Sequence, residues 1–216
     1  RGSAYSPDYV GVLQKIILPV NLQEIGEYAF YQRNNLKTVK FSGASLQKWT
    51  IGDYAFYEAG LTEFPFNSDK LKSIGDYAFY GARMGFYSEM FFSQITLGEG
   101  LETIGESAFF NIVQLDENWK TKYWEITIPE SVTSVGKNAF SWSSVRKVTF
   151  SGKSQMTELA EGLFDQSDLA SIEIPASVKT IGADAFSGCA SLTELVIPEG
   201  VTSIGDGAFA SMTSLE

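Results

Sequence analysis

Histidine is absent from the 216-residue chain, and cysteine occurs once, as Cys189. Without histidine the chain has no Ser-His-Asp or Cys-His triad, no histidine-ligated zinc and no imidazole base for catalysis near neutral pH. A single cysteine also excludes an intrachain disulfide and a four-thiolate metal site. We therefore expect a protein without catalytic residues, bound metal or cofactor.

Basic residues are few: 16 Lys and Arg stand against 26 Asp and Glu, which gives a net charge of -10. Nucleic acids and anionic membrane surfaces are unfavourable partners for such a charge. Apolar runs long enough to span a membrane are missing, and the first residues do not resemble a signal peptide. We expect a soluble segment that binds no nucleic acid and does not insert into membranes.

One hexapeptide recurs along the whole chain, and it ends in Ala-Phe in nearly every copy. Well-preserved copies occupy residues 25–30, 51–56, 74–79, 104–109, 135–140, 181–186 and 204–209, and a degenerate copy occupies 159–164. Their final Phe residues are spaced by 26, 23, 30, 31, 24, 22 and 23 positions. The spacing predicts about eight units of a basic length near 23 residues, of which two in the middle are longer.

Between the hexapeptides lies a short stretch in which apolar and outward residues alternate. Leu195 and Ile197 fall on one face, and Glu194 and Val196 on the other, as expected for a half-buried strand. The equivalent apolar pairs are Ile16/Leu18, Val39/Phe41, Phe64/Phe66, Ile95/Leu97, Ile126/Ile128, Val148/Phe150 and Ile172/Ile174. The pattern predicts one strand of about five residues in each unit.

A unit of this length buries too few side chains to offset the entropy of ordering its backbone, so it cannot fold alone. Neighbouring units must share their cores, which predicts a solenoid with a parallel strand ladder. The Ala-Phe step indicates a short helical or 3-10 turn in each unit, with the Phe at the centre of the coil.

The stretch Leu169 to Cys189 reads Leu-x-x-Ile-x-Ile-Pro-x-x-Val-x-x-Ile-Gly-x-x-Ala-Phe-x-x-Cys. This pattern resembles the BspA-like, or treponemal-type, leucine-rich repeat family. The resemblance covers residues 13–216, after a lead-in of residues 1–12, and the chain is expected to end within a repeat. It implies a right-handed solenoid on bacterial surface or secreted proteins that act in adhesion and host-protein binding, without catalytic residues.

An acidic residue follows the hexapeptide Gly in most copies. A stacked column of carboxylates is one way to bind Ca²⁺, but Lys137 and Ala183 interrupt it. We expect these acids to cap free N–H groups of the turn instead. For Cys189 we expect a buried structural thiol, because no histidine is present to activate it. Tyrosines that repeat before and after Ala-Phe are expected to stack between coils, although an aromatic binding strip is an alternative.

The outward strand residues are expected to line the concave face. Among them, Thr96, Thr127 and Thr149 predict a ladder of three hydroxyls suited to protein or sugar contacts. Glu173 and Glu194 lie on neighbouring rungs, at a diagonal distance of about 7 Å, near the separation in inverting glycosidases. Because nothing on an open face is expected to raise either pKa, a carboxylate-based glycosidase is only a remote alternative.

Both long units are expanded directly after the Phe turn, between Phe79 and Ile95 and between Phe109 and Ile126. Equivalent points on stacked coils are neighbours, so the two insertions are expected to emerge side by side. They are more apolar than ordinary solvent-exposed loops, and we expect them to form either a small satellite core or a binding patch. Our candidate anchors are Phe86, Trp119 and Trp124.

The sequence thus predicts a non-enzymatic surface or secreted module that binds a macromolecular partner, such as a host or matrix protein. A carbohydrate-binding surface and a passive spacer within a larger surface protein are the alternatives. The extracellular location follows from the family resemblance alone.

Overall fold

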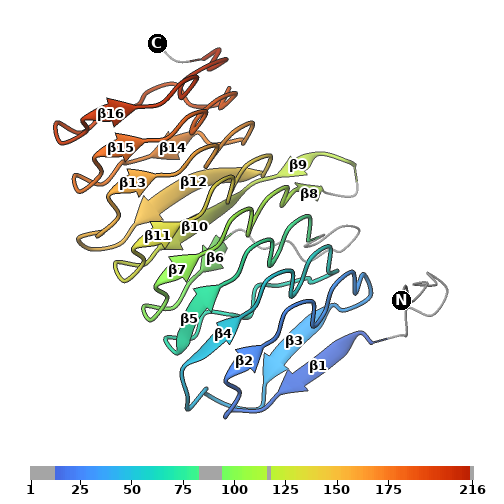
Figure 1. Cartoon of the computed structure of the whole chain (residues 1–216). Helices are drawn as coiled ribbons and strands as arrows, with labels where there is room; N and C mark the ends of the chain where they lie inside the picture. The colour runs from blue at the N-terminus through green and yellow to red at the C-terminus, as the bar shows by residue number, and fades with distance from the viewer. Residues whose placement is uncertain (1–12, 83–93, 116–117, 215–216) are drawn as a thin grey trace, which may run out of the picture.

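The computed structural model describes residues 13–82, 94–115 and 118–214, which wind into a parallel β-solenoid (Figure 1). Two rows of parallel strands run along the stack of coils. The first row holds the predicted strands, in the orders β1-β3 and β6-β10-β12-β14. The second row lies just before the hexapeptide Gly, in the orders β2-β4-β5-β7-β11 and β13-β15-β16, and it was not predicted.

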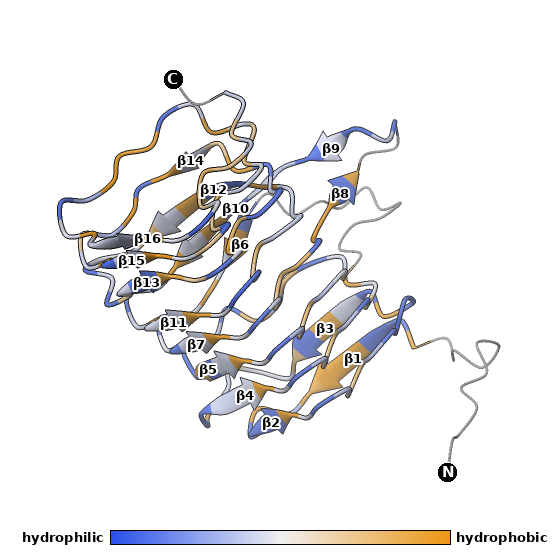
Figure 2. Cartoon of the chain, turned by 45° about the horizontal axis from the view of Figure 1, so that its top comes forward, coloured by the Kyte–Doolittle hydropathy of each residue, from blue (hydrophilic) through white to orange (hydrophobic). Residues whose placement is uncertain are grey.

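The strands are short, and their lengths follow the alternation of buried and outward residues. Those of the first row are β1 (Lys15–Leu18), β3 (Thr38–Phe41), β6 (Gln94–Thr96), β10 (Trp124–Ile128), β12 (Val145–Phe150) and β14 (Ser171–Ile172). Those of the second row are β2 (Glu24–Ile25), β4 (Trp49–Ile51), β5 (Leu71–Ile74), β7 (Thr103–Ile104), β11 (Ser134–Val135), β13 (Glu158–Leu159), β15 (Thr180–Ile181) and β16 (Ser203–Ile204). An antiparallel pair, β8 (Gln114–Leu115) and β9 (Thr121–Lys122), lies apart from both rows (Figures 1 and 2).

Two of the predicted strands are not part of the ladder. Residues 63–66 and 194–197 are not assigned to strands, although Phe66 is fully buried as the alternation requires. Pro65 explains the first case, because proline has no N–H to donate to a neighbouring strand. The alternation therefore predicted correctly that the side chain of Phe66 faces the core, but it predicted incorrectly that the backbone there pairs with a neighbouring strand.

A column of Phe rings fills the centre of the coils, as predicted. Neighbouring rings are stacked with centroids 5.0 to 5.8 Å apart from Phe30 to Phe209. The six inner members are at most 1% exposed, and the two end members are half-buried. Because each inner ring packs against the coils on both sides, the column couples every unit to its neighbours.

The predicted helical turn is wrong, since the described residues contain no helix and the hexapeptide forms consecutive tight turns instead. In the first coil the amide of Ala29 donates back to Gly26 O at 3.2 Å, whereas that of Phe30 donates forward to Ala55 O in the next coil at 2.7 Å. Along the turn, backbone amides thus donate alternately to a carbonyl of their own turn and to a carbonyl of the next coil. A continuous helix would need all of them for bonds within one coil.

Two positions in each turn have left-handed backbone. The fourth hexapeptide residue has φ between 51° and 64° at Tyr28, Tyr54, Tyr77, Ser107, Asn138, Gly162, Asp184 and Gly207. The residue four positions later has φ between 50° and 69° at Gln32, Glu58, Gly81, Asn111, Trp142, Gln166, Gly188 and Ser211. Left-handed backbone favours Gly and Asn, and most residue types at these positions are small or polar.

The hexapeptide Gly allows the coils to approach each other closely. A Cβ atom on Gly105 would lie 2.5 Å from the backbone N of Asp76 in the preceding coil. By contrast, a Cβ atom on Gly26 would have no neighbour within 4 Å. The Gly is therefore required by coil stacking and not by the turn itself.

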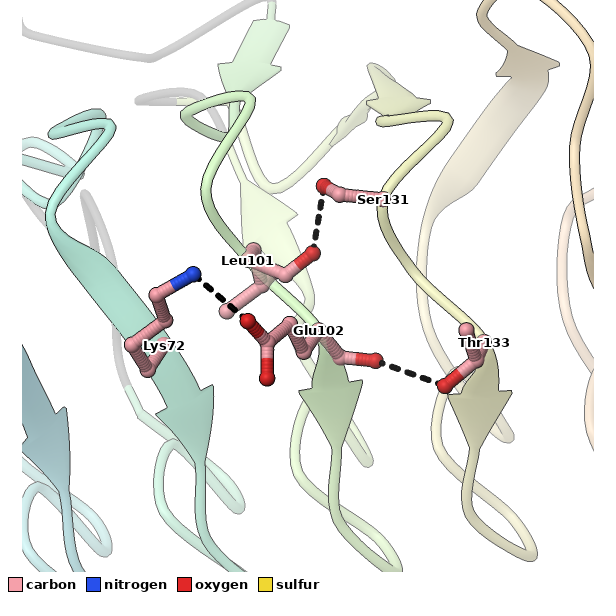
Figure 3. Close-up of polar contacts among 5 residues, drawn as sticks. All are labelled: Lys72, Leu101, Glu102, Ser131 and Thr133. Carbon is pink, nitrogen blue, oxygen red and sulfur yellow. Dashed lines mark hydrogen bonds and ion pairs between the residues drawn. The ribbon is translucent and has the colours of Figure 1, made fainter.

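Polar side chains also connect neighbouring coils beside the second row (Figure 3). Lys72 Nζ forms an ion pair with Glu102 Oε1 at 2.5 Å, which lowers the pKa of that carboxyl. The hydroxyl of Ser131 donates to Leu101 O at 2.6 Å, and that of Thr133 donates to Glu102 O at 3.4 Å. Because the ion pair is exposed to solvent and screened by it, these contacts only add to a stack that the core already stabilises.

Candidate functional site

The second insertion forms the β8–β9 hairpin, and its base is part of the solenoid core. Ile112 and Trp124 are both 0% exposed, and Trp124 Nε1 donates to Ile112 O at 3.1 Å. Its ring lies 6.4 Å from that of Phe140. A fully buried indole with its N–H satisfied within the chain cannot contact a partner, so the prediction of Trp124 as a binding residue is wrong.

The second insertion and the coil that follows it expose three large aromatic side chains. Trp119 is 62% exposed, Tyr123 46% and Trp142 54%. Trp119 and Tyr123 belong to the insertion, and Trp142 belongs to the following coil. The amide of Trp124 donates to Ser144 O at 3.2 Å, which joins the two coils at this point. We call Trp119, Tyr123 and Trp142 the aromatic edge.

Arg146 holds Tyr123 in place at the aromatic edge. Its guanidinium carbon lies 4.8 Å from the centroid of the Tyr123 ring, and its Nη1 donates to Ser191 Oγ at 3.3 Å. Partial burial raises the pKa of the nearby Asp168 carboxyl, and the charge of Arg146 opposes that increase. The contact of Arg146 with Tyr123 could not be predicted from the repeat, because no local sequence pattern places an arginine beneath a ring from another coil.

Trp142 is unusual for its position in the turn. It has left-handed backbone with φ 57°, where the other coils have Gln, Glu, Gly, Asn or Ser. A bulky side chain is disfavoured in this conformation, and such strain is concentrated at functional positions in many proteins. The strain and the exposure together make Trp142 a candidate contact residue.

The threonine ladder lies on the outward face of the first row, as the strand alternation predicted. Thr127 is in register with Thr96 on one side and Thr149 on the other. Thr96 and Thr149 are exposed and Thr127 is half-buried. Their presence on one open face agrees with the strand alternation, and their contact with a partner stays a prediction.

A hollow of about 1310 Å³ adjoins this ladder at its C-terminal end. Its polar lining includes Lys147, Thr149, Ser171, Glu173 and Glu194. The two glutamates considered as a glycosidase pair therefore line the same hollow.

Comparison with protein families gives a direct result. The model of the BspA type leucine-rich repeat region matches residues 8–118 and 118–216. The chain belongs to this family. Its repeat family and its solenoid fold are typical of proteins without enzymatic activity. Comparison with curated proteins finds no match.

Solved structures of similar fold come from several bacteria. A leucine-rich repeat protein from Eubacterium ventriosum is 21% identical, with a TM-score of 0.60 over 94% of this chain and 60% of that one. The T. pallidum leucine-rich repeat protein is 24% identical, with a TM-score of 0.58 over 98% and 86%. The pneumococcal vaccine antigen PcpA is 23% identical, with a TM-score of 0.55 over 93% and 61%. These likenesses establish the fold, and the chain spans about 60% of the Eubacterium protein.

The acids of this BspA-type solenoid bond from one coil to the next. Asp53 Oδ1 accepts the amide of Asp76 at 2.8 Å, and Asp76 Oδ1 accepts the amide of Glu106 at 2.7 Å. The predicted capping is thus directed at the neighbouring coil and not at the acid's own turn. Where Lys137 interrupts the column, it forms an ion pair with Glu161 at 2.7 Å. In the described part of the chain, no three acidic or thiol groups lie close enough to share a metal ion.

Cys189, the final residue of the BspA-type motif, is buried as predicted. Its Sγ donates to Phe164 O at 3.1 Å and lies 3.6 Å from Ser167 Oγ. Burial raises the pKa of the thiol to about 11. A protonated thiol bonded within the core is structural and not a nucleophile.

The first insertion, which contains Phe86, lies outside the described residues. Its predicted position beside the second insertion and the predicted contact by Phe86 therefore stay predictions. Across the described ranges, no helix is long and apolar enough to cross a membrane.

Proposed function

We propose that this BspA-type chain is a non-enzymatic binding module, displayed on or secreted from a bacterial cell, that binds a host or matrix protein. The observation that carries the proposal is the aromatic edge of Trp119, Tyr123 and Trp142. Each of these large side chains is between 46% and 62% exposed. Exposed Trp and Tyr side chains are the residues that most often anchor protein interfaces.

The edge combines apolar rings with fixed polar groups. Tyr123 packs against Arg146, which Ser191 also contacts, so this part of the surface is held in place before a partner arrives. Preorganised aromatic side chains lose little conformational entropy on binding. An acidic domain with such an edge suits a protein partner better than an anionic polymer.

An extracellular location is supported by the family and by fold relatives. PcpA, a protein of the same fold, is a vaccine antigen. An extracellular location for this chain is part of the proposal.

A binding screen against purified serum and matrix proteins tests the proposal. Immobilised chain should capture at least one of them saturably, and Trp119→Ala combined with Trp142→Gln should weaken capture about a hundredfold, as loss of two anchors does. Gln is the residue at the matching position in two other coils, Gln32 and Gln166, so the turn should tolerate it. Thr127→Ala is the matched control and should bind normally.

The threonine face is the second candidate surface. Its hollow is lined by Lys147, Thr149 and Glu194, which are suited to hydrogen bonds with sugar hydroxyls. If Thr127→Ala removes binding on a glycan array and the tryptophan variants do not, the chain binds carbohydrate. Binding neither in the protein screen nor on the glycan array indicates a spacer. Polysaccharide turnover that depends on Glu173 or Glu194 would overturn the non-enzymatic proposal.

A further inference from the structure

Two columns of aromatic rings lie on the turn edge of the first coils. Tyr28, Tyr54 and Tyr77 form one column, with successive centroids 4.9 Å apart. The second column stacks at 5.0, 4.8 and 4.6 Å and consists of Tyr31, Tyr57, Tyr80 and Phe110. The columns touch, since the Tyr54 and Tyr57 centroids are 5.9 Å apart. We call these seven residues the tyrosine strip.

The fold does not require tyrosine at these positions. The coil of Asn138 has the same left-handed backbone as that of Tyr54, with φ 55° in both, and it has Ser141 in place of Tyr57. Asn is favoured in this conformation, whereas Tyr is disfavoured. Three consecutive coils nevertheless carry the less favourable residue. Stacking of the rings offsets the cost of placing Tyr in this conformation. It does not explain why the later coils have no tyrosine at these positions.

The surface of the strip is formed by ring edges and hydroxyl groups. Because the rings stack face to face, their faces cover one another and their edges remain accessible. Tyr28 is 51% exposed, and the other members are half-buried. The hydroxyl of Tyr77 donates to Glu106 Oε1 at 2.7 Å. The strip therefore offers apolar edges together with polar tips.

Negative charge surrounds the strip. The four turns at residues 26–33, 52–59, 75–82 and 105–112 contain five acids, Glu27, Asp53, Glu58, Asp76 and Glu106, against a single base, Arg33. Asp53 and Asp76 each accept an amide from the next coil with one carboxylate oxygen. These bonds fix the carboxylates beside the rings, where they favour a cationic partner.

We propose that the tyrosine strip binds a proline-rich segment that carries Lys or Arg, in the polyproline II conformation. A polyproline II helix presents the same face every three residues, about 9.3 Å. The centroids of Tyr28, Tyr54 and Tyr77 are successively 4.9 Å apart, so the first and third rings are separated by nearly the length of that repeat. Aromatic surfaces of this kind are a recurring way to recognise such helices, whose carbonyl groups are free to accept tyrosine hydroxyls.

The basic side chains of the segment would pair with the acids beside the rings. Their aliphatic stems would lie along the ring edges, as the stems of Lys and Arg do on apolar surfaces. The tyrosine strip shares no residue with the aromatic edge, so the proposal does not depend on a partner at Trp119 or Trp142.

Fluorescence anisotropy with a labelled peptide of repeated Pro-Pro-Lys triplets tests the proposal. The peptide should bind saturably, and Tyr54→Asn combined with Tyr57→Ser should raise its Kd about tenfold or more. These substitutions copy the residues of the Asn138 coil, so the variant should fold. Leu46→Ala, at an exposed side chain outside both surfaces, is the control and should leave the Kd unchanged. Raising the salt concentration should weaken binding, because the charged groups are exposed.

Two further peptides separate shape from charge. A Gly-Ser-Lys repeat has the same charge without the proline helix, and a Pro-Pro-Glu repeat has the helix with the opposite charge; both should bind at least about tenfold more weakly. Equal affinity for either peptide, an unchanged Kd in the double variant, or no saturable binding of the Pro-Pro-Lys peptide would each overturn the proposal. If the double variant fails to fold, Tyr54→Phe with Tyr57→Phe keeps the stack and should still weaken binding through loss of the hydroxyls.

Discussion

Replacing Phe140 by Ala should uncouple the two halves of the solenoid. The ring is 1% exposed and lies between Phe109 at 5.5 Å and Phe164 at 5.7 Å, with Trp124 at 6.4 Å. Removing a buried Phe costs about 3–5 kcal/mol, because its transfer energy is lost and a cavity stays behind. Here the rings above and below are held by their own coils, so the cavity cannot collapse readily, and we expect the upper part of that range.

Phe209 provides a matched control within the same column. It is half-buried and stacks on one ring, Phe186, at 5.8 Å. Because less of its surface leaves water on folding, Phe209→Ala should cost less than about 2 kcal/mol. The difference between the two variants isolates the contribution of a central position from that of the Phe side chain itself.

Urea unfolding followed by circular dichroism measures both free energies of unfolding. Hydrogen exchange by mass spectrometry then tests the coupling, since stability in a repeat array depends on interfaces between neighbours. In Phe140→Ala, residues 24–80 and residues 158–209 should lose protection at different urea concentrations. A cost below about 1 kcal/mol, or one shared unfolding transition for both segments, would refute the reasoning.

Three other predictions follow from single contacts. Gly105→Ala should lower the free energy of unfolding by about 2 kcal/mol or more, since its Cβ would lie 2.5 Å from backbone, whereas Gly26→Ala should be neutral within about 1 kcal/mol; equal effects in urea melts would contradict this. Cys189, with its pKa raised to about 11 by burial, should react with a thiol reagent at pH 8 only after unfolding, and rapid reaction of the folded chain would show the thiol is accessible. The bond to Glu106 raises the pKa of Tyr77 to about 12, so its contribution to stability should be complete below about pH 10 and lost as the pH rises through about 12. Ultraviolet titration of the wild type and of Tyr77→Phe measures the pKa values of the tyrosines. The variant should lack the tyrosine that titrates near pH 12, and the same high-pH titration in both proteins would refute the prediction.

The sequence alone determined the solenoid, its Phe column and the rungs of the threonine ladder. A repeat near 23 residues places equivalent positions of consecutive coils next to one another. The neighbours of Phe140 and Thr127 could therefore be read from alignment of the chain with itself. Burial of Cys189 followed in the same way, because its column is mostly small or apolar and no histidine is present to activate the thiol.

Only the tertiary structure decided how the turns are bonded and which aromatic side chains are exposed. The turn amides of one coil donate to carbonyls of the next, and this choice between partners is not encoded in any single repeat. Trp119 and Trp124 lie five residues apart in the same insertion, yet one is 62% exposed and the other 0%. An insertion has no equivalent in the other coils, so repeat periodicity says nothing about its side chains. Their burial depends on long-range packing, here the fit of Trp124 against Ile112 and Phe140.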